Sequence, residues 1–217
     1  MRLLLLALLA LVAVPALAAA DDCPPAHFAS TSIPAHDFYA SSVDTGLVGG
    51  AESLTVHYKW GVDVGEAFLR RVSALGSGGS SLDIVDDFTV GRVPNGTPVS
   101  FDAILSAYGN APPAAPSGPA WTVTLGTDQD SVSGGNVYTN WSQDLTLPLN
   151  VIAGTPFRLH FRMQIFGGFD SLVQNEGASI RFEGFPPGAI VFSCHGFLAG
   201  SLPTEPTTWG SLKARYH

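Results

Sequence analysis

The stretches GTPVSFDAILSAYG (Gly96–Gly109) and GTPFRLHFRMQIFG (Gly154–Gly167) carry one pattern, 154 − 96 = 58 residues apart. Each starts with a Gly-Thr-Pro turn, continues as alternating apolar and polar positions, and closes with an aromatic residue and a glycine. A period of two predicts a β-strand that buries one face. The apolar positions are Val99, Phe101, Ala103, Leu105 and Ala107 in the first copy and Phe157, Leu159, Phe161, Met163 and Ile165 in the second. The chain therefore contains an internal strand repeat.

Strand-like alternation continues over most of the remaining chain. It runs through Leu54–Trp60, Leu82–Val90, Trp121–Leu125, Leu145–Leu149 and Ala178–Phe182, and Ile190 and Phe192 complete the series of apolar positions. Turn-forming residues separate the strands at Pro94–Gly96, Ser133–Asn136 and Pro186–Gly188. The segment Glu66–Leu75 has a composition that also suits a short helix, but its neighbours favour a strand. We expect little or no helix elsewhere in the mature chain.

These patterns predict an all-β protein. One-sided burial is typical of antiparallel sheets, and two such sheets stacked face to face form a β-sandwich, here of jelly-roll or Ig-like type. A single closed barrel is the second interpretation. The expected organisation is a signal peptide over residues 1–20, a β-sandwich domain over residues 21–200 and a flexible C-terminal tail over residues 201–217. The Pro-rich stretch Ala111–Pro119 is interpreted as a long surface loop within the one domain.

The N-terminus predicts export. Arg2 precedes an apolar run, Leu3–Val14, and Pro15 is followed by small residues. This is the arrangement of a secretory signal peptide, with cleavage near Ala18 or Ala20. The apolar run is shorter than the roughly 20 residues of a membrane span, and no later stretch could supply a span in the mature chain. We expect a secreted, extracellular or cell-surface protein.

The two cysteines of the mature chain, Cys23 and Cys194, allow a single pairing. Disulfides persist in exported proteins, so we predict a Cys23–Cys194 bridge that ties the N-terminal segment to one of the last strands.

The charge of the chain excludes one class of partner. Only 13% of its residues are charged and its net charge is −8. Because nucleic-acid binding depends on clustered lysines and arginines, the composition argues against a nucleic-acid partner.

The order of motifs resembles a family of exported β-rich bacterial proteins, many with a PEP-CTERM surface-sorting tail. The resemblance rests on the Asp-rich strand Asp83–Val90, the Gly-Thr-Pro turns, Phe185–Ala189 and Ser193–Phe197. It implies an extracellular or cell-surface location and no assigned chemistry. The C-terminal end departs from the family pattern, because Thr204–Pro206 is not followed by a membrane-spanning sorting tail.

Candidate binding residues fall into two groups. Trp60, Trp121 and Trp141 are in phase with apolar neighbours, which favours packing in the core over a platform for sugars. The outward positions of the second repeat strand form a basic stripe of Arg158, His160, Arg162 and Gln164. The stripe could face an acidic polymer or a sugar. A solvated sheet face, or pairing with the many aspartates, is the interpretation we favour.

The sequence offers little for catalysis or for metal binding. The six histidines lack the spacing of a metal site, and Asp128–Asn136 reads as a polar hairpin tip rather than a calcium loop. Neither a nucleophile elbow nor a zinc-protease motif occurs, and no cofactor is expected. Glycosidases need paired carboxylates, and Glu66, Glu176 and Glu183 could supply them, although nothing in the sequence places them together.

The leading functional hypothesis is therefore a non-enzymatic secreted or cell-surface protein with a structural or adhesive role. A carbohydrate-binding module is the alternative, and a secreted hydrolase is a distant third. The expected partners are extracellular polysaccharide or other matrix components.

Overall fold

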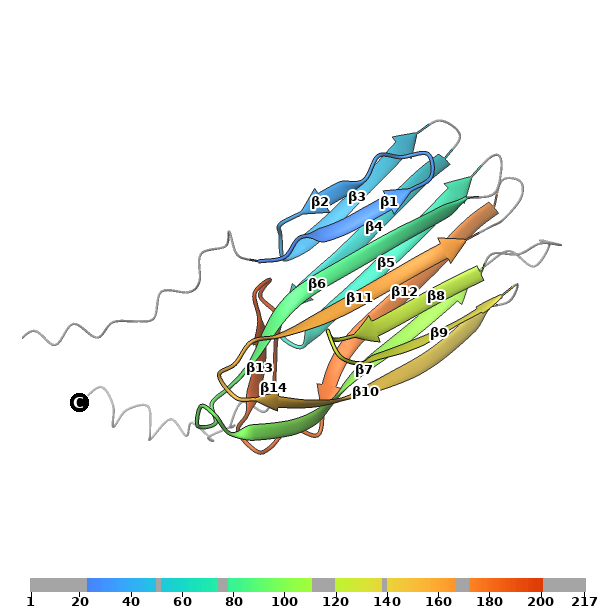
Figure 1. Cartoon of the computed structure of the whole chain (residues 1–217). Coiled ribbons are helices and arrows are strands. Elements are labelled where there is room, and N and C mark those ends of the chain that lie inside the picture. Colours follow the sequence, from blue (N-terminus) through green and yellow to red (C-terminus); the bar gives the residue numbers. More distant parts are fainter. Residues whose placement is uncertain are drawn as a thin grey trace, which may run out of the picture.

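The computed structural model describes residues 23–49, 52–73, 78–110, 120–137, 140–166 and 172–200 (Figure 1). The predicted signal peptide, the Pro-rich stretch Ala111–Pro119 and the predicted tail lie outside these residues. The described part of the chain consists of strands and their connections, without a helix, as predicted. The ambiguous segment Glu66–Leu75 falls largely in a strand, β5 (Val64–Ser73). Among the described residues there is consequently no helix that could cross a membrane.

The strands form two sheets. The eight-stranded sheet contains β1 (Ala26–Ser30), β2 (His36–Phe38), β6 (Gly79–Gly91), β8 (Ala120–Gly126), β9 (Ser131–Val137), β11 (Phe157–Phe166), β13 (Ile190–Ser193) and β14 (Leu198–Gly200). The six-stranded sheet has the order β10 (Trp141–Ile152), β7 (Pro98–Asn110), β12 (Leu172–Glu183), β5, β4 (Glu52–Gly61) and β3 (Ser42–Gly49). The two sheets pack face to face on one shared core (Figure 1). The predicted antiparallel sandwich is confirmed, and the closed-barrel interpretation is wrong.

The internal repeat is a structural repeat. Strands β7 and β11 lie in opposite sheets; β6 leads into β7 and pairs with β11, while β10 leads into β11 and pairs with β7. The two turns repeat their hydrogen bonds: Thr97 N donates to Pro94 O at 3.1 Å, and Thr155 N donates to Ile152 O at 3.0 Å. Each repeat unit thus crosses from one sheet to the other at its Gly-Thr-Pro turn, and each strand of one unit pairs with a strand of the other unit.

The inward positions of both copies are buried as the alternation predicts, apart from Phe157, which is partly buried against the core. Aromatic rings fill the centre, where Phe88, Phe182 and Phe197 meet edge to face. The inward positions predicted for one strand, β13, are wrong. In the short strand β13 it is Val191 that is buried, and Phe192 is 40% exposed on the outer face. A strand of four residues between two turns carries too few positions for its period to show its phase.

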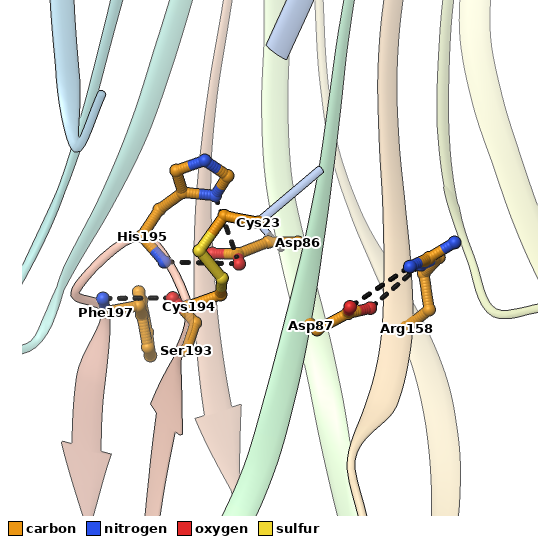
Figure 2. Close-up of a disulfide and its surroundings, with 8 residues drawn as sticks. All are labelled: Cys23, Asp86, Asp87, Arg158, Ser193, Cys194, His195 and Phe197. Atoms are coloured by element: carbon orange, nitrogen blue, oxygen red, sulfur yellow. Dashed lines mark hydrogen bonds and ion pairs between the residues drawn. A yellow bond between two sulfur atoms is a disulfide. The ribbon is translucent and has the colours of Figure 1, made fainter. Parts of the chain in front are cut away.

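The predicted disulfide is present. Cys23 and Cys194 are bridged across a sequence separation of 171, with Cα atoms 5.7 Å apart (Figure 2). Backbone hydrogen bonds hold the turn that carries Cys194: the Cys194 amide donates to Asp87 O at 2.9 Å, and the His195 amide donates to the buried Asp86 carboxylate at 3.3 Å. The bridge attaches the segment that precedes β1 to this turn after β13.

Candidate functional site

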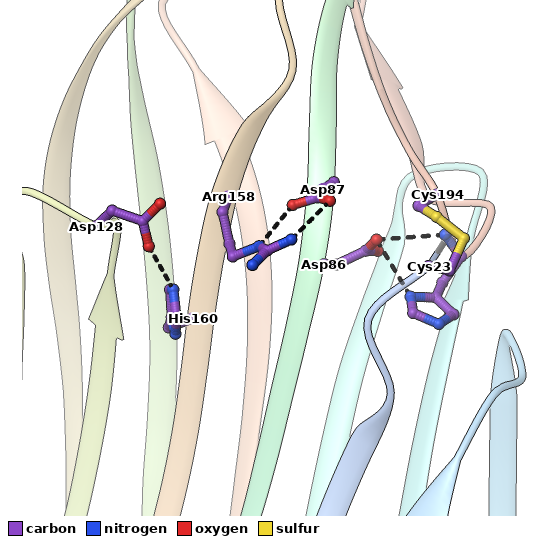
Figure 3. Close-up of polar contacts among 8 residues, drawn as sticks. Cys23, Asp86, Asp87, Asp128, Arg158, His160 and Cys194 are labelled. Atoms are coloured by element: carbon purple, nitrogen blue, oxygen red, sulfur yellow. Dashed lines mark hydrogen bonds and ion pairs between the residues drawn. A yellow bond between two sulfur atoms is a disulfide. The ribbon is translucent and has the colours of Figure 1, made fainter. Parts of the chain in front are cut away.

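The predicted basic stripe lies on the outer face of the eight-stranded sheet, and aspartates neutralise it. Arg158 donates two hydrogen bonds to Asp87, at 2.8 and 3.0 Å, and His160 lies 3.0 Å from Asp128 (Figure 3). Arg162 pairs with Asp83, and Gln164 continues the row next to Ser81. The hydrogen bond and charge of Asp87 raise the pKa of Arg158. The strand register of β11 and β6 therefore produces a ladder of ion pairs.

The tryptophans follow the predicted core phase where their side chains are described. Trp60 is buried, and Trp141 packs against the core with its indole Nε1 inside. The Trp121 side chain lies outside the described part. The two described tryptophans are therefore not surface platforms for a ligand.

The three carboxylates considered for a hydrolase do not converge. Glu66 and Glu183 lie on the outer face of the six-stranded sheet, and Glu183 accepts a hydrogen bond from Arg181 at 2.8 Å. Glu176 points the other way, into the core, where it is fully buried and neither carboxylate oxygen has a protein hydrogen-bond partner. Burial raises the pKa of Glu176 well above its usual range. Within the described residues there is also no cluster of three side chains suited to a metal ion.

A trough crosses the outer face of the six-stranded sheet. Its volume is about 380 Å³, and it lies over β10, β7, β12, β5 and β4. Strand pairing places one outward residue from each of the six strands of this sheet in a row that runs across it. The row is Ser142, Tyr108, Gly177, Phe68, His57 and Asp44, and all but Asp44 line the trough.

Tyr108 and Gly177 form the floor of this trough. The Tyr108 ring lies over Gly177, so that a Cβ atom at this position would clash with Cζ, Cε1 and Oη of the tyrosine. The same side chain remains 42% exposed. Only glycine leaves room for the ring here, and Phe68 flanks the glycine from the other neighbouring strand. The result is an aromatic floor that is open to solvent on one side.

The row that contains Tyr108 and Phe68 is called the aromatic row. A polar row runs parallel to it, two residues away along each strand. It consists of Asp144, Ser106, Ser179, Glu66 and Lys59, which are successive register partners. Arg181 closes one end of it by donating to Ser106 Oγ at 2.5 Å and to Asp144 at 3.4 Å. The hydrogen bonds from Ser106 and Arg181 lower the pKa of Asp144. The trough thus offers apolar surface on one side and hydrogen-bonding groups on the other.

The repeat supplies an internal comparison for Tyr108. Its equivalent, 58 residues on, is Phe166, which is also 42% exposed and lies over Gly79 of the neighbouring strand. Covering a strand glycine with an aromatic ring stabilises a sheet by itself. What distinguishes Tyr108 is its place in the trough, since Phe166 lies on the outer face of the other sheet.

The sequence patterns do not identify this site. Tyr108 carried one signal, because it occupies an outward position at the end of the first repeat strand. Nothing in the sequence shows that Gly177 and Phe68 lie beside it. Those two residues are 69 and 40 positions from Tyr108 (177 − 108 and 108 − 68), and strand pairing alone brings them together.

No protein-family model and no curated protein matches this chain. Among solved structures the chain is similar to TmCBM61 in complex with beta-1,4-galactotriose. The identity is 11% and the TM-score is 0.28, with 58% of this chain and 70% of that chain covered. A likeness at this TM-score does not support a shared ligand, so the trough is interpreted from its own geometry.

Proposed function

We propose that this chain is an exported, non-enzymatic protein that binds carbohydrate outside the cell and thereby serves an adhesive or structural role. The observation that carries the proposal is the half-exposed Tyr108 ring on the floor of the trough. The Cys23–Cys194 disulfide supports the compartment, because such bonds persist in oxidising surroundings. The resemblance to exported surface proteins agrees with the same location.

The chemistry of the trough suits a sugar. A sugar ring presents C–H groups on its faces and hydroxyl groups around its edge. Aromatic rings receive the faces through dispersion contacts, and a few well-placed polar groups set orientation and specificity. Tyr108 and Phe68 supply the first kind of surface, while Glu66, Ser106 and Ser179 supply the second.

Binding without catalysis is the form of the proposal that the geometry favours. Hydrolysis of a glycosidic bond requires two carboxyl groups on either side of that bond. Of the carboxylates that the sequence analysis considered, only Glu66 lines the trough, and Glu176 is buried behind the same sheet. The trough can therefore hold a glycan but is not equipped by these residues to cleave it.

A glycan array, followed by calorimetry on any glycan that is retained, tests the proposal. We expect wild-type protein and Phe166→Ala to bind, and Tyr108→Ala to lose at least about tenfold in affinity, as expected for one aromatic contact. Phe166→Ala is the matched control, because it removes the equivalent ring from the other sheet. Absence of binding to every glycan, or equal losses in both variants, would remove the proposed site.

A further inference from the structure

The long axis of the trough runs across the strands, because strand pairing aligns its lining residues in that direction. Its aromatic row and its polar row both run across the strands. Outward residues of one strand are two positions apart, so the two rows are separated by about 6.6–6.8 Å. A ligand that uses both rows along its whole length must lie perpendicular to the strands, with one side on Tyr108 and Phe68 and one edge on Ser179 and Glu66.

The aromatic row is longer than one sugar ring. Tyr108 on β7 and Phe68 on β5 are separated by β12, which corresponds to about 9–10 Å at the usual strand spacing. His57 on β4 extends the row by one more strand, to about 14–15 Å. The trough lies on the outer face of the sheet, and Tyr108 within it is 42% exposed. Its shape suits several consecutive residues of an extended chain.

The charges of the lining select against an acidic chain. Among the described residues that line the trough, Glu66, His57 and Tyr108 are the titratable side chains, and none is a lysine or an arginine. Lys59 lies next to Glu66 in register, and Arg181 at the other end is engaged by Asp144 and Glu183. With a net charge of −8 on the whole chain, a uronate or sulfated polymer would meet repulsion at Glu66.

The geometry points to an internal stretch of an extended, uncharged polysaccharide as the ligand, lying across the strands from Tyr108 toward His57. This inference rests on the proposed function and adds to it the charge, the minimum length and the orientation of the glycan. The outer face of the other sheet, with its Asp–Arg ladder, takes no part in binding.

Calorimetry with two series of oligosaccharides tests the inference. The first series is neutral and contains β-1,4-linked gluco-, xylo- and galacto-oligosaccharides of one to six residues, and the second contains oligogalacturonates of the same lengths. For at least one neutral sugar we expect affinity to rise by about tenfold or more between one and three residues and then to level off. We expect binding of the oligogalacturonates to be at least about tenfold weaker than that of the neutral chains.

Two variants test the orientation. His57→Ala shortens the row across the strands, so we expect it to weaken binding of a tetrasaccharide several-fold and to leave a disaccharide unaffected. Arg70→Ala is the control, because Arg70 is exposed one pleat from Phe68 along the same strand and lies outside the trough. Thermal unfolding of both variants establishes that they are folded.

The outcomes separate this inference from the proposed function. Binding that does not depend on length, that favours uronates, or that is weakened by Arg70→Ala and not by His57→Ala overturns the inference and leaves carbohydrate binding intact. Failure of all the sugars, including those of the array, overturns both.

Discussion

Replacing Glu176 with leucine is expected to stabilise this protein at neutral pH. The carboxyl group is fully buried between the sheets and has no protein hydrogen-bond partner. Its register neighbours are Leu69 on one side and Gly109 on the other. Arg71, inward on the adjacent strand, is engaged by Glu52 at 2.8 Å. A leucine at position 176 would keep the burial and remove the unsatisfied polar atoms.

The magnitude follows from the cost of burying such a group. An unsatisfied buried polar group costs about 1–3 kcal/mol. The free energy of unfolding of Glu176→Leu should therefore exceed that of the wild type by at least about that amount at pH 7. Each kcal/mol raises the melting temperature by about 2–4 °C in a domain of this size. Glu176→Gln keeps an unpartnered amide but cannot ionise, so it should fall between the two.

The pH dependence has a definite sign. Because burial raises the pKa of Glu176, the folded state retains a proton that the unfolded state releases above its own pKa, near 4.5. The contribution of Glu176 to stability is therefore most favourable below pH 4.5 and is lost as the pH rises toward the folded-state pKa, by about 1.4 kcal/mol for each unit of separation.

Urea unfolding between pH 4 and pH 8 measures this effect. The difference between Glu176→Leu and wild type should be about 1–3 kcal/mol at pH 4, where the carboxyl is neutral but unsatisfied, and should grow toward pH 8. A difference that is the same at all pH values, or a leucine variant that is less stable at pH 8, would refute the reasoning.

Three further predictions concern other elements of the fold. Arg71→Met should destabilise the protein by about 3–5 kcal/mol in urea unfolding, because it leaves Glu52 buried without its cation. Burial raises the pKa of Glu52, but the hydrogen bond and charge of Arg71 outweigh burial and lower it, so the wild type loses this stabilisation as the pH falls below about 4.5. The variant, which lacks the stabilisation, should not show that loss. A Cys23→Ser, Cys194→Ser double variant should be about 2–5 kcal/mol less stable and insensitive to reductant in a thermal melt, whereas the wild type should fall to the same level on reduction. Gly154→Ala should cost at least about 1 kcal/mol in the same melt, because its φ is +78° and the Asn95 side chain leaves little room for a methyl group.

The sequence predicted most of the fold because its signal is local. In a strand the side chains alternate between two faces, so one buried face appears directly as a period of two, as in Val99–Ala107 and Leu54–Trp60. The turn residues of the repeat, Gly96 and Gly154, marked where the chain reverses. The Cys23–Cys194 bridge was also predictable, since two cysteines have one pairing. The short strand β13 was the exception, because four residues do not establish a phase.

The candidate site depended on distant residues and was therefore missed. The positions of Arg158 and Arg162 were correct, but their partners, Asp87 and Asp83, become known only from the register of β11 on β6. In the same way, the sequence indicates that Tyr108 is an outward aromatic residue at the end of a strand, but its neighbours Gly177 and Phe68 become known only from strand pairing.

Composition and alternation determined that this is an all-β chain with a duplicated strand and a disulfide, because those features depend on residues within a few positions of one another or on a single possible pairing. Only the tertiary structure decided which strands are neighbours. That choice placed the ring of Tyr108 over Gly177 and turned Glu176 into the core. The physical reason is that pairing between strands far apart in sequence is set by how two whole sheets bury their apolar faces together, which no local pattern records.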